Sequence, residues 1–126
     1  MPNYKELRLL YLTQINEGLC KCILSGLIIT QPRFLSLEHF TPCCRGGYDE
    51  TRAITNVFPA YKIINNLKGP RLGCEWMMER ESIYKKALSK GHLRSADREI
   101  VEKALANMPR YNINPCNYCI LHEQCY

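Results

Sequence analysis

The sequence predicts an α+β fold in which a two-stranded antiparallel hairpin and one following helix form the centre, with further helices before and after them. Alternating apolar and polar residues at 34–39 and a β-prone run at 54–58 indicate two strands. The segment between them contains Gly46-Gly47, which is typical of a loop. With 126 residues, 46% of them hydrophobic, the chain is long enough to bury one core, so we expect a single domain over residues 1–126.

The second strand is expected to lead directly into a helix over residues 59–68. Pro59 suits the first position of a helix, because that position has no hydrogen bond to lose, and Gly69 suits the position just past the end. Strand, loop, strand and helix therefore form the predicted central unit. The apolar contacts of this helix are expected from Ile63, Ile64 and Leu67.

Three further helices are predicted around this unit. Apolar side chains recur at helical spacing in residues 3–17, and Gly18 follows them. Residues 74–89 and 95–108 are read as two more helices, and Ser95 is suited to cap the last of them. The side chains expected in the core are Leu7, Leu10, Tyr11 and Ile15 from the first helix and Trp76, Met77, Ile83, Tyr84 and Leu88 from the second.

The formal net charge of +5 is concentrated in one half of the chain. Residues 61–110 contain eleven Lys or Arg against six Asp or Glu. A basic surface confined to one stretch suits a polyanionic partner, so Lys85, Lys86 and Lys90 are candidate nucleic-acid contacts. A solvated helix face is the alternative explanation of the same charges.

We expect an intracellular, cytoplasmic protein without a membrane span. The first residues, MPNYKELRLL, carry charges and lack the apolar region of a signal peptide. The longest aliphatic run, ILSGLII, is too short to cross a bilayer.

Eight cysteines are many for an intracellular chain of this length. Without a secretory segment, metal ligation by zinc is favoured over disulfides or incidental thiols. In the tail, Cys116-x-x-Cys119 and Cys125 can present three thiolates to one tetrahedral ion. A tail of ordinary thiols without metal is the alternative. The fourth ligand stays open among Cys20, Cys22, Cys74 and His122.

Four polar residues of the central unit are candidates for one site. Glu38 and His39 stand side by side where the first strand ends, and Asn65 and Lys68 share one face of the helix because they are three residues apart. Metal-assisted hydrolysis of a phosphodiester requires such a set: oxygen ligands, a neutral base and a cation near the phosphate. Taken singly, the histidine is explained as a structural or solvated residue, and the asparagine as a cap or surface residue.

Five landmarks follow one another in the chain: Glu38-His39, Pro42, Gly46-Gly47, Asn56, and the segment from Asn65 to Gly69. Their order and spacing resemble the HNH, or ββα-metal, endonucleases, whose pattern is roughly [DE]-H-x-x-P…G-G…N-[LIV]…[HN]-x-x-K-G. The joint match is specific in a way that a single His or Gly-Gly is not. The resemblance implies a ββα-metal core over about residues 19–70, followed by a basic helical extension over about 74–110 and the Cys-rich tail at 115–126.

The resemblance also implies a role for each matched side chain. His39 would be the general base that takes a proton from the attacking water, with its imidazole oriented by a backbone carbonyl. Glu38 and Asn65 would be ligands of one divalent cation, Mg²⁺ or Mn²⁺. Asn56 would fix His39 by hydrogen bonds to loop backbone, and Lys68 would neutralise charge on the pentacoordinate phosphorus.

The chain departs from the family at one point. Many members bind a structural zinc through two C-x-x-C knuckles, and the four matching positions here are Cys22, Ser25, Tyr61 and Ile64. Because three of the four are not cysteine, we expect this zinc site to be absent. The cysteines of the tail would then replace it and stabilise a small domain.

Two functions follow as hypotheses. The first is a metal-dependent HNH endonuclease that nicks or cuts duplex DNA through a 3′-oxygen leaving group; Arg45 would grip a flanking phosphate unless it is an exposed loop cation. The second is a zinc-stabilised nucleic-acid-binding or adaptor module without turnover. A protein partner is expected to supply sequence specificity, because the chain is short for a separate recognition domain. A bacterial, phage or mobile-element origin is the accompanying expectation.

Overall fold

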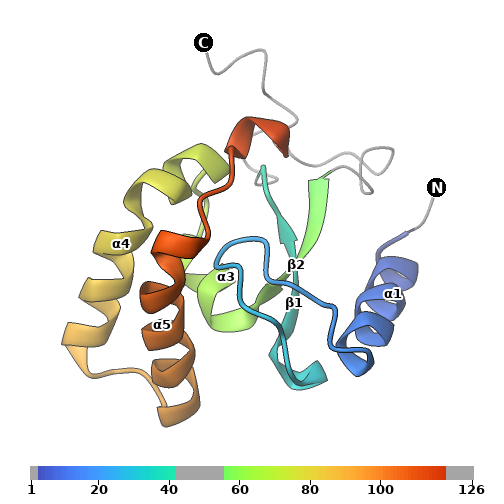
Figure 1. Ribbon diagram of the computed structural model, residues 1–126, viewed down its shortest axis with the longest axis horizontal. Helices are drawn as coiled ribbons and strands as arrows, with labels where there is room; N and C mark the ends of the chain where they lie inside the picture. Colours follow the sequence, from blue (N-terminus) through green and yellow to red (C-terminus); the bar gives the residue numbers. More distant parts are fainter. Residues whose placement is uncertain (1–2, 42–55, 119–126) are drawn as a thin grey trace.

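A two-stranded antiparallel hairpin forms the centre of the fold (Figure 1). Strand β1 (Leu35–His39) pairs with β2 (Val57–Tyr61) in a register that places Leu35 opposite Tyr61 and His39 opposite Val57. The structure is a computed structural model, and it describes residues 3–41 and 56–118. The α+β class and the antiparallel hairpin predicted from the sequence are confirmed.

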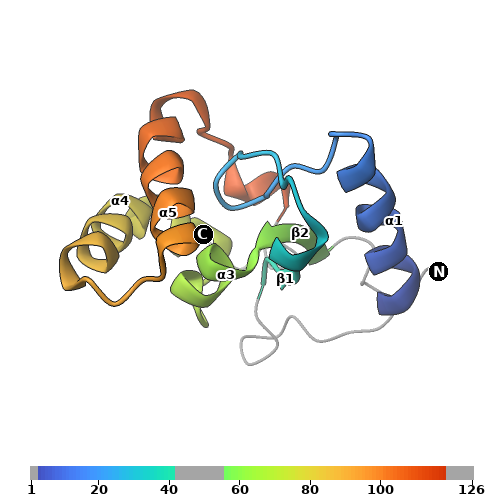
Figure 2. The same ribbon diagram turned by 90° about the horizontal axis from the view of Figure 1, so that it is seen from below.

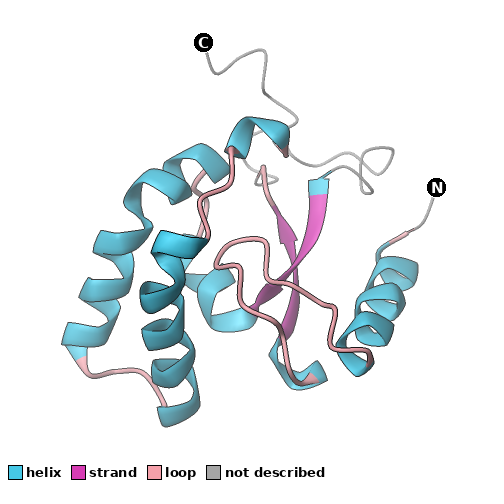
Figure 3. Ribbon diagram, in the orientation of Figure 1, coloured by secondary structure: helices cyan, strands magenta, loops and turns pink. Residues whose placement is uncertain are grey.

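The helices are divided between the two sides of the hairpin. Helix α1 (Tyr4–Asn16) lies on one side, whereas α4 (Gly73–Lys90) and α5 (Ser95–Asn107) lie on the other (Figures 1 and 2). Helix α3 (Lys62–Lys68) follows β2 directly and contacts both strands as well as α4 and α5. Figure 3 shows that strands occur only at this centre among the described residues. Three short 3₁₀ turns complete the described elements: η1 (Pro32–Phe34), η4 (Met108–Arg110) and η5 (Pro115–Asn117).

The second strand lies further along the chain than predicted, and Pro59 belongs to it rather than to the helix. Pro59 pairs with Leu37, and its carbonyl accepts a hydrogen bond from the Ile23 amide on the other edge of β2. In a strand, the nitrogen and oxygen of one residue point to the same edge, so the missing N–H of Pro59 costs no bond to β1. The expected run at 54–58 therefore shifts to 57–61, and residues 54 and 55 lie outside the described residues.

The predicted helices are present with small corrections. Gly18, at φ 71°, and Gly69, at φ 57°, follow α1 and α3 as expected. Leu10 was predicted in the core, but it is 49% exposed, because α1 packs through a narrow face that carries Leu7 and Ile15. Ser95 is the first residue of α5 rather than its cap, and Arg94 holds the cap position without a side-chain hydrogen bond.

The main core fills the space between the hairpin, α4 and α5. Helix α4 contributes Trp76 and Tyr84, whose rings meet edge to face at 5.4 Å, and α5 contributes Val101 and Ala104. Met77, Ile83 and Leu88 pack against this core while partly exposed. None of the described helices is both long and apolar enough to cross a membrane.

Residues 20–29 form a compact turn that lies between the hairpin and the C-terminal half of the chain and contacts both through hydrogen bonds. Its backbone closes on itself, because the amides of Cys22, Gly26 and Ile29 donate to the carbonyls of Leu27, Cys22 and Cys20. Gly26 has φ 76°, and the Tyr111 ring packs so closely that a Cβ there would lie 2.4 Å from it. This position therefore requires glycine twice, for its backbone conformation and for the approach of the ring.

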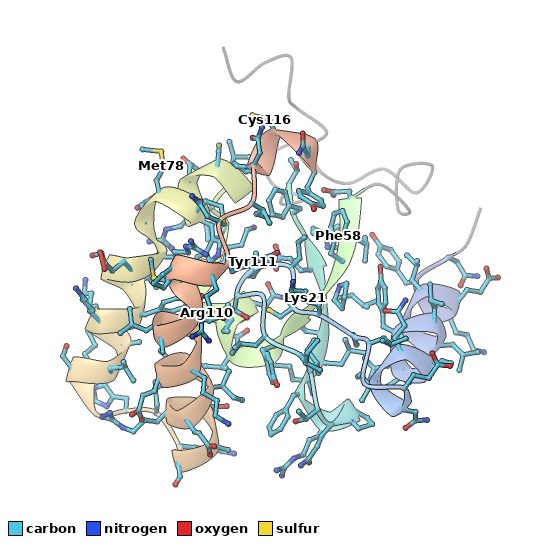
Figure 4. All side chains as sticks on the ribbon, in the orientation of Figure 1. Lys21, Phe58, Met78, Arg110, Tyr111 and Cys116 are labelled. Carbon is cyan, nitrogen blue, oxygen red and sulfur yellow. The ribbon has the colours of Figure 1, made fainter. Side chains whose placement is uncertain are left out.

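Three consecutive carbonyls of this turn accept hydrogen bonds from distant side chains. Trp76 Nε1 donates to Leu24 O at 3.0 Å, Asn107 Nδ2 to Ser25 O at 2.9 Å, and the Tyr111 hydroxyl to Ile23 O at 2.6 Å. The donors belong to α4, to α5 and to the segment after α5. Figure 4 shows Tyr111 beside Lys21, which belongs to this turn. The Lys21 ammonium lies 5.2 Å from the centre of the Tyr111 ring. These hydrogen bonds attach the turn to the C-terminal half of the chain. The Ile23 amide attaches the same turn to β2.

We expect Tyr111→Phe to lower the free energy of unfolding by about 1–2 kcal/mol, because it removes a buried hydrogen bond and leaves the ring in place. Tyr118→Phe is the matched control, since the Tyr118 ring contacts Phe40 and Phe58. Thermal and urea unfolding measure both variants. Equal stability of the two variants would show that the Tyr111 hydroxyl contributes nothing to the turn.

Candidate active site

Strand β1 and helix α3 place three of the four predicted site residues, Glu38, Asn65 and Lys68, between them. Along a strand, side chains alternate between the two faces, so Ser36 and Glu38 point to the face that α3 covers. Asn65 Nδ2 donates to Ser36 Oγ at 2.9 Å, and Lys68 contacts Glu38. The predicted common face of Asn65 and Lys68 on the helix therefore meets β1.

Glu38 and Lys68 form a buried ion pair. The distance from Lys68 Nζ to Glu38 Oε1 is 2.8 Å, and the two side chains are 0% and 3% exposed, respectively. The same ammonium approaches the backbone oxygen of His39 at 3.4 Å. Burial raises the pKa of Glu38 to about 7, and the Lys68 charge opposes this rise. Removing one partner alone would leave a buried charge without compensation, so the two residues depend on each other.

His39 points to the opposite face of the hairpin, toward α1. Its Nε2 hydrogen-bonds the Tyr4 hydroxyl at 2.5 Å, and the two ring centres are 5.4 Å apart. Burial and the nearby Lys68 charge hold the pKa of His39 below its usual value. The imidazole is therefore neutral at pH 7, which a general base requires. Among the described residues its hydrogen-bonding partner is a tyrosine, where the family resemblance implied a backbone carbonyl.

Helix α1 supports the strand end through two tyrosines that the sequence analysis did not assign to the site. Tyr4 reaches His39, and the Tyr11 hydroxyl donates to the backbone oxygen of Val57 at 3.0 Å. Val57 is the residue opposite His39 in the hairpin. Tyr4 and Tyr11 are seven residues apart, so they share a helix face with the apolar Leu7. This spacing is the feature of the sequence that could have placed both tyrosines against the hairpin.

Asn56 closes the hairpin at the point where the long connection begins and ends. Its side chain accepts from the Thr41 amide at 2.9 Å and donates to the Thr41 oxygen at 3.1 Å, and its own backbone oxygen accepts from the Phe40 amide. The resemblance implied hydrogen bonds from this residue to loop backbone, and Thr41 lies two residues after His39. Asn56 thereby fixes the chain that leaves the site.

The remaining nucleic-acid candidates are placed differently from one another. Lys85 lies 3.5 Å from Glu81, one helical turn away on α4. Lys86 and Lys90 instead border a hollow of about 310 Å³, which also includes Arg71 and His92 and has no acidic residue in its lining. Arg45 lies outside the described residues, as do Pro42 and Gly46-Gly47.

The four positions that match the family's zinc knuckles, Cys22, Ser25, Tyr61 and Ile64, are all buried in the core. The Tyr61 amide donates to Cys22 Sγ at 3.4 Å, and the Ser25 side chain also hydrogen-bonds this thiol. Ile64 packs in the same core, and all four residues are buried. Burial raises the pKa of the Cys22 thiol, so it remains protonated. These four side chains are thus engaged in apolar packing and hydrogen bonds of the core.

Of the three cysteines of the predicted tail site, only Cys116 is among the described residues. Cys116 lies in η5, which packs on α4, whereas Cys119, Cys125 and His122 lie outside the described residues. Within residues 3–41 and 56–118, no group of three or more His, Cys, Asp or Glu side chains could hold a metal ion. Among the open choices for a fourth ligand, Cys20 and Cys22 are fully buried in the core, whereas Cys74 is half-buried on the helix that η5 contacts.

The oxygen donors on the α3 face of the hairpin are of the kind that a hard divalent cation prefers. Glu38 provides a carboxylate, and Asn65 donates to Ser36 through its nitrogen, which leaves its amide oxygen for a ligand role. Both side chains lie on the α3 face of the hairpin. Lys68 already neutralises one carboxylate oxygen, so its predicted contact with the phosphate would require the ammonium to leave Glu38.

Comparison with family models, with curated proteins and with solved structures gives no match. The resemblance to HNH endonucleases therefore rests on the order and spacing of the motif in the sequence alone.

We expect the metal-free protein to lose stability as the pH rises from about 5 to about 7. Below its pKa of about 7 the native Glu38 keeps a proton, so the ion pair with Lys68 is complete only above this pH, whereas the unfolded chain has already released the proton. The expected loss in the free energy of unfolding is up to about 3 kcal/mol. Urea unfolding across this pH range in EDTA measures it for the wild type and for Glu38→Gln.

The variant Glu38→Gln should lose this pH dependence, because the amide does not titrate. It should also be less stable than the wild type, because the Lys68 charge stays buried without a partner. Glu79→Gln, an exposed substitution on α4, is the matched control and should keep the wild-type slope. Parallel curves for the wild type and Glu38→Gln would contradict the assignment of the slope to Glu38.

Proposed function

We propose that the protein is a metal-dependent endonuclease of the HNH type that hydrolyses phosphodiester bonds in duplex DNA. The observation that carries this proposal is that α3 places Asn65 against Ser36 and Lys68 against Glu38 on one face of β1, with His39 as the next residue. These residues match the motif in order. A cytoplasmic location and a bacterial or phage origin belong to the same proposal.

The residues divide the reaction between them. Glu38 and Asn65 would hold Mg²⁺ or Mn²⁺, which when bound supplies positive charge for the phosphate oxygens. His39, neutral at pH 7, takes a proton from the attacking water, and Tyr4 orients its imidazole. Lys68 balances the charge of Glu38 and holds the backbone of His39. The hydroxide oxygen forms a bond to phosphorus as the bond between phosphorus and the 3′-oxygen breaks. The 3′-oxygen takes a proton from solvent, which leaves a 3′-hydroxyl and a 5′-phosphate.

A second function is favoured by the burial of the ion pair. Because Glu38 and Lys68 already satisfy each other out of contact with solvent, the scaffold also suits a nucleic-acid-binding module without turnover. In that case the module would act as an adaptor that links a nucleic acid to a partner protein. Relaxation of supercoiled plasmid with Mg²⁺ but not with EDTA separates the enzyme from the module.

Replacing the base should abolish cleavage and leave binding intact. We expect His39→Ala to reduce the cleavage rate by about 10² to 10⁴, because a general base contributes a factor of this size. Thr13→Ala, an exposed change on α1, is the control. Single-turnover cleavage and DNA binding in EDTA are measured for both. Cleavage by His39→Ala at the control rate would remove the histidine from the mechanism.

The tail cysteines are proposed to bind one structural zinc. Protein purified without chelators should then contain about one zinc per chain, and Cys116→Ser with Cys119→Ser should lose it and melt at a lower temperature. Cys74→Ser should weaken zinc binding if this thiol is the fourth ligand. Cys22→Ser is the matched control, because its thiol is engaged in the core, and it should keep the zinc. Elemental analysis without zinc in the wild type would leave the tail as ordinary thiols.

A further inference from the structure

A second basic hollow lies at the first turn of α3, where β1 begins and β2 ends. Its volume is about 410 Å³, and it is formed by the end of η1, by α3 and by the first turn of α5. Arg33, Lys62 and Arg94 contribute three positive charges to its lining, against one negative charge from Asp97. All three basic residues are exposed, so their charges are available to a ligand.

Aromatic side chains form the wall of this hollow. The Phe34 and Tyr61 ring centres are 5.7 Å apart, and the Arg33 guanidinium lies 4.6 Å from the centre of the Phe34 ring. Stacking on a ring restrains a planar guanidinium that would otherwise sample many rotamers. Arg33 is therefore presented in a defined place, ready for the paired hydrogen bonds that guanidinium groups make with phosphate.

The two basic hollows are neighbours along the same helix face. Ile63 and Asn66 of α3 line the first hollow, and Leu67 lines the second. The connection between α4 and α5 also borders both, through Arg94 in the first and Leu93 in the second. The cations of the two hollows therefore form one band, which consists of Arg33, Lys62 and Arg94 together with Arg71, Lys86 and Lys90.

The band lies within reach of a duplex that occupies the candidate active site. Lys62 and Lys68 are the two ends of α3, so they are separated by about 9 Å at about 1.5 Å per residue. This distance corresponds to about three steps of a DNA strand, at roughly 3.4 Å per nucleotide along the axis. A regular row of phosphates matches a band of separated cations better than a single small anion does.

We propose that Arg33, Lys62 and Arg94 bind backbone phosphates of the DNA duplex about three base pairs to one side of the bond that is cut. This inference rests on the proposed function, and it gives that function a defined flank of substrate. The contacts are to phosphates, so they position the duplex and do not select its sequence. Selection of sequence is then left to another surface or to a partner.

The test compares two double charge reversals that change the net charge equally. Arg33→Glu with Arg94→Glu alters the band, and Arg8→Glu with Arg110→Glu alters exposed arginines that line neither hollow. Binding of a fluorescent duplex is measured in EDTA over a series of salt concentrations, so that no cleavage occurs. The band variant should lose about 1.8 from the slope of log K against log salt and bind at least about tenfold more weakly near 0.1 M salt. The control should stay within about twofold of the wild type.

Each outcome decides a separate question. Equal weakening of the two double variants, or no binding of the duplex by the wild type, overturns the inference. Binding of poly-glutamate in place of DNA would also overturn it and indicate an acidic protein partner. Binding with the expected slopes but no cleavage with Mg²⁺ overturns the proposed function and leaves the band as a DNA contact. If the band variant has a lower melting temperature than the control, Lys62→Gln with Arg94→Gln replaces it. This pair changes the net charge by half as much, and we expect it to weaken DNA binding in the same direction.

Discussion

Three neighbouring carbonyls, those of Ile23, Leu24 and Ser25, hold the two halves of this protein together. Each accepts a hydrogen bond from a buried or half-buried side chain of the C-terminal half, and the Ile23 amide in turn binds the edge of β2. A two-stranded hairpin is marginal by itself in water. The turn supplies a third segment at its edge, and α4 and α5 cover it. Directional hydrogen bonds and apolar packing close this turn.

The hairpin separates the candidate catalytic groups because its side chains alternate. Glu38 meets α3 on one face, and His39 meets Tyr4 of α1 on the other. The two groups share only the strand end, where Asn56 fixes the departing chain through Thr41. A phosphodiester that is to reach both must therefore lie across the end of β1. Helix α1, although it packs through a narrow face, becomes part of the site because it determines where the imidazole is held.

Electrostatics at this strand end are governed by Lys68. Its ammonium lies against the Glu38 carboxylate and the His39 carbonyl, and its charge lowers the pKa values of both side chains. Burial favours the neutral form of each group, so it raises the pKa of Glu38 and lowers the pKa of His39. The outcome is a neutral histidine and a carboxyl group that titrates near pH 7. The cations that are exposed to a polyanion lie instead around the two hollows beside α3: Arg33, Lys62, Arg94, Lys86 and Lys90.

The sequence by itself determined the α+β class, the hairpin, the approximate helices and the pairing of Asn65 with Lys68 on one helix face, because these follow from local periodicity and turn residues. It misplaced Pro59, since the choice between strand and helix depended on the Ile23 amide at the far edge of β2. It could not find Tyr4 as the partner of His39, or the Lys68 ion pair, because both join elements about thirty residues apart. Only the tertiary structure decided these contacts, since hydrogen bonds and buried charges are fixed by which surfaces meet, and no local pattern encodes that meeting.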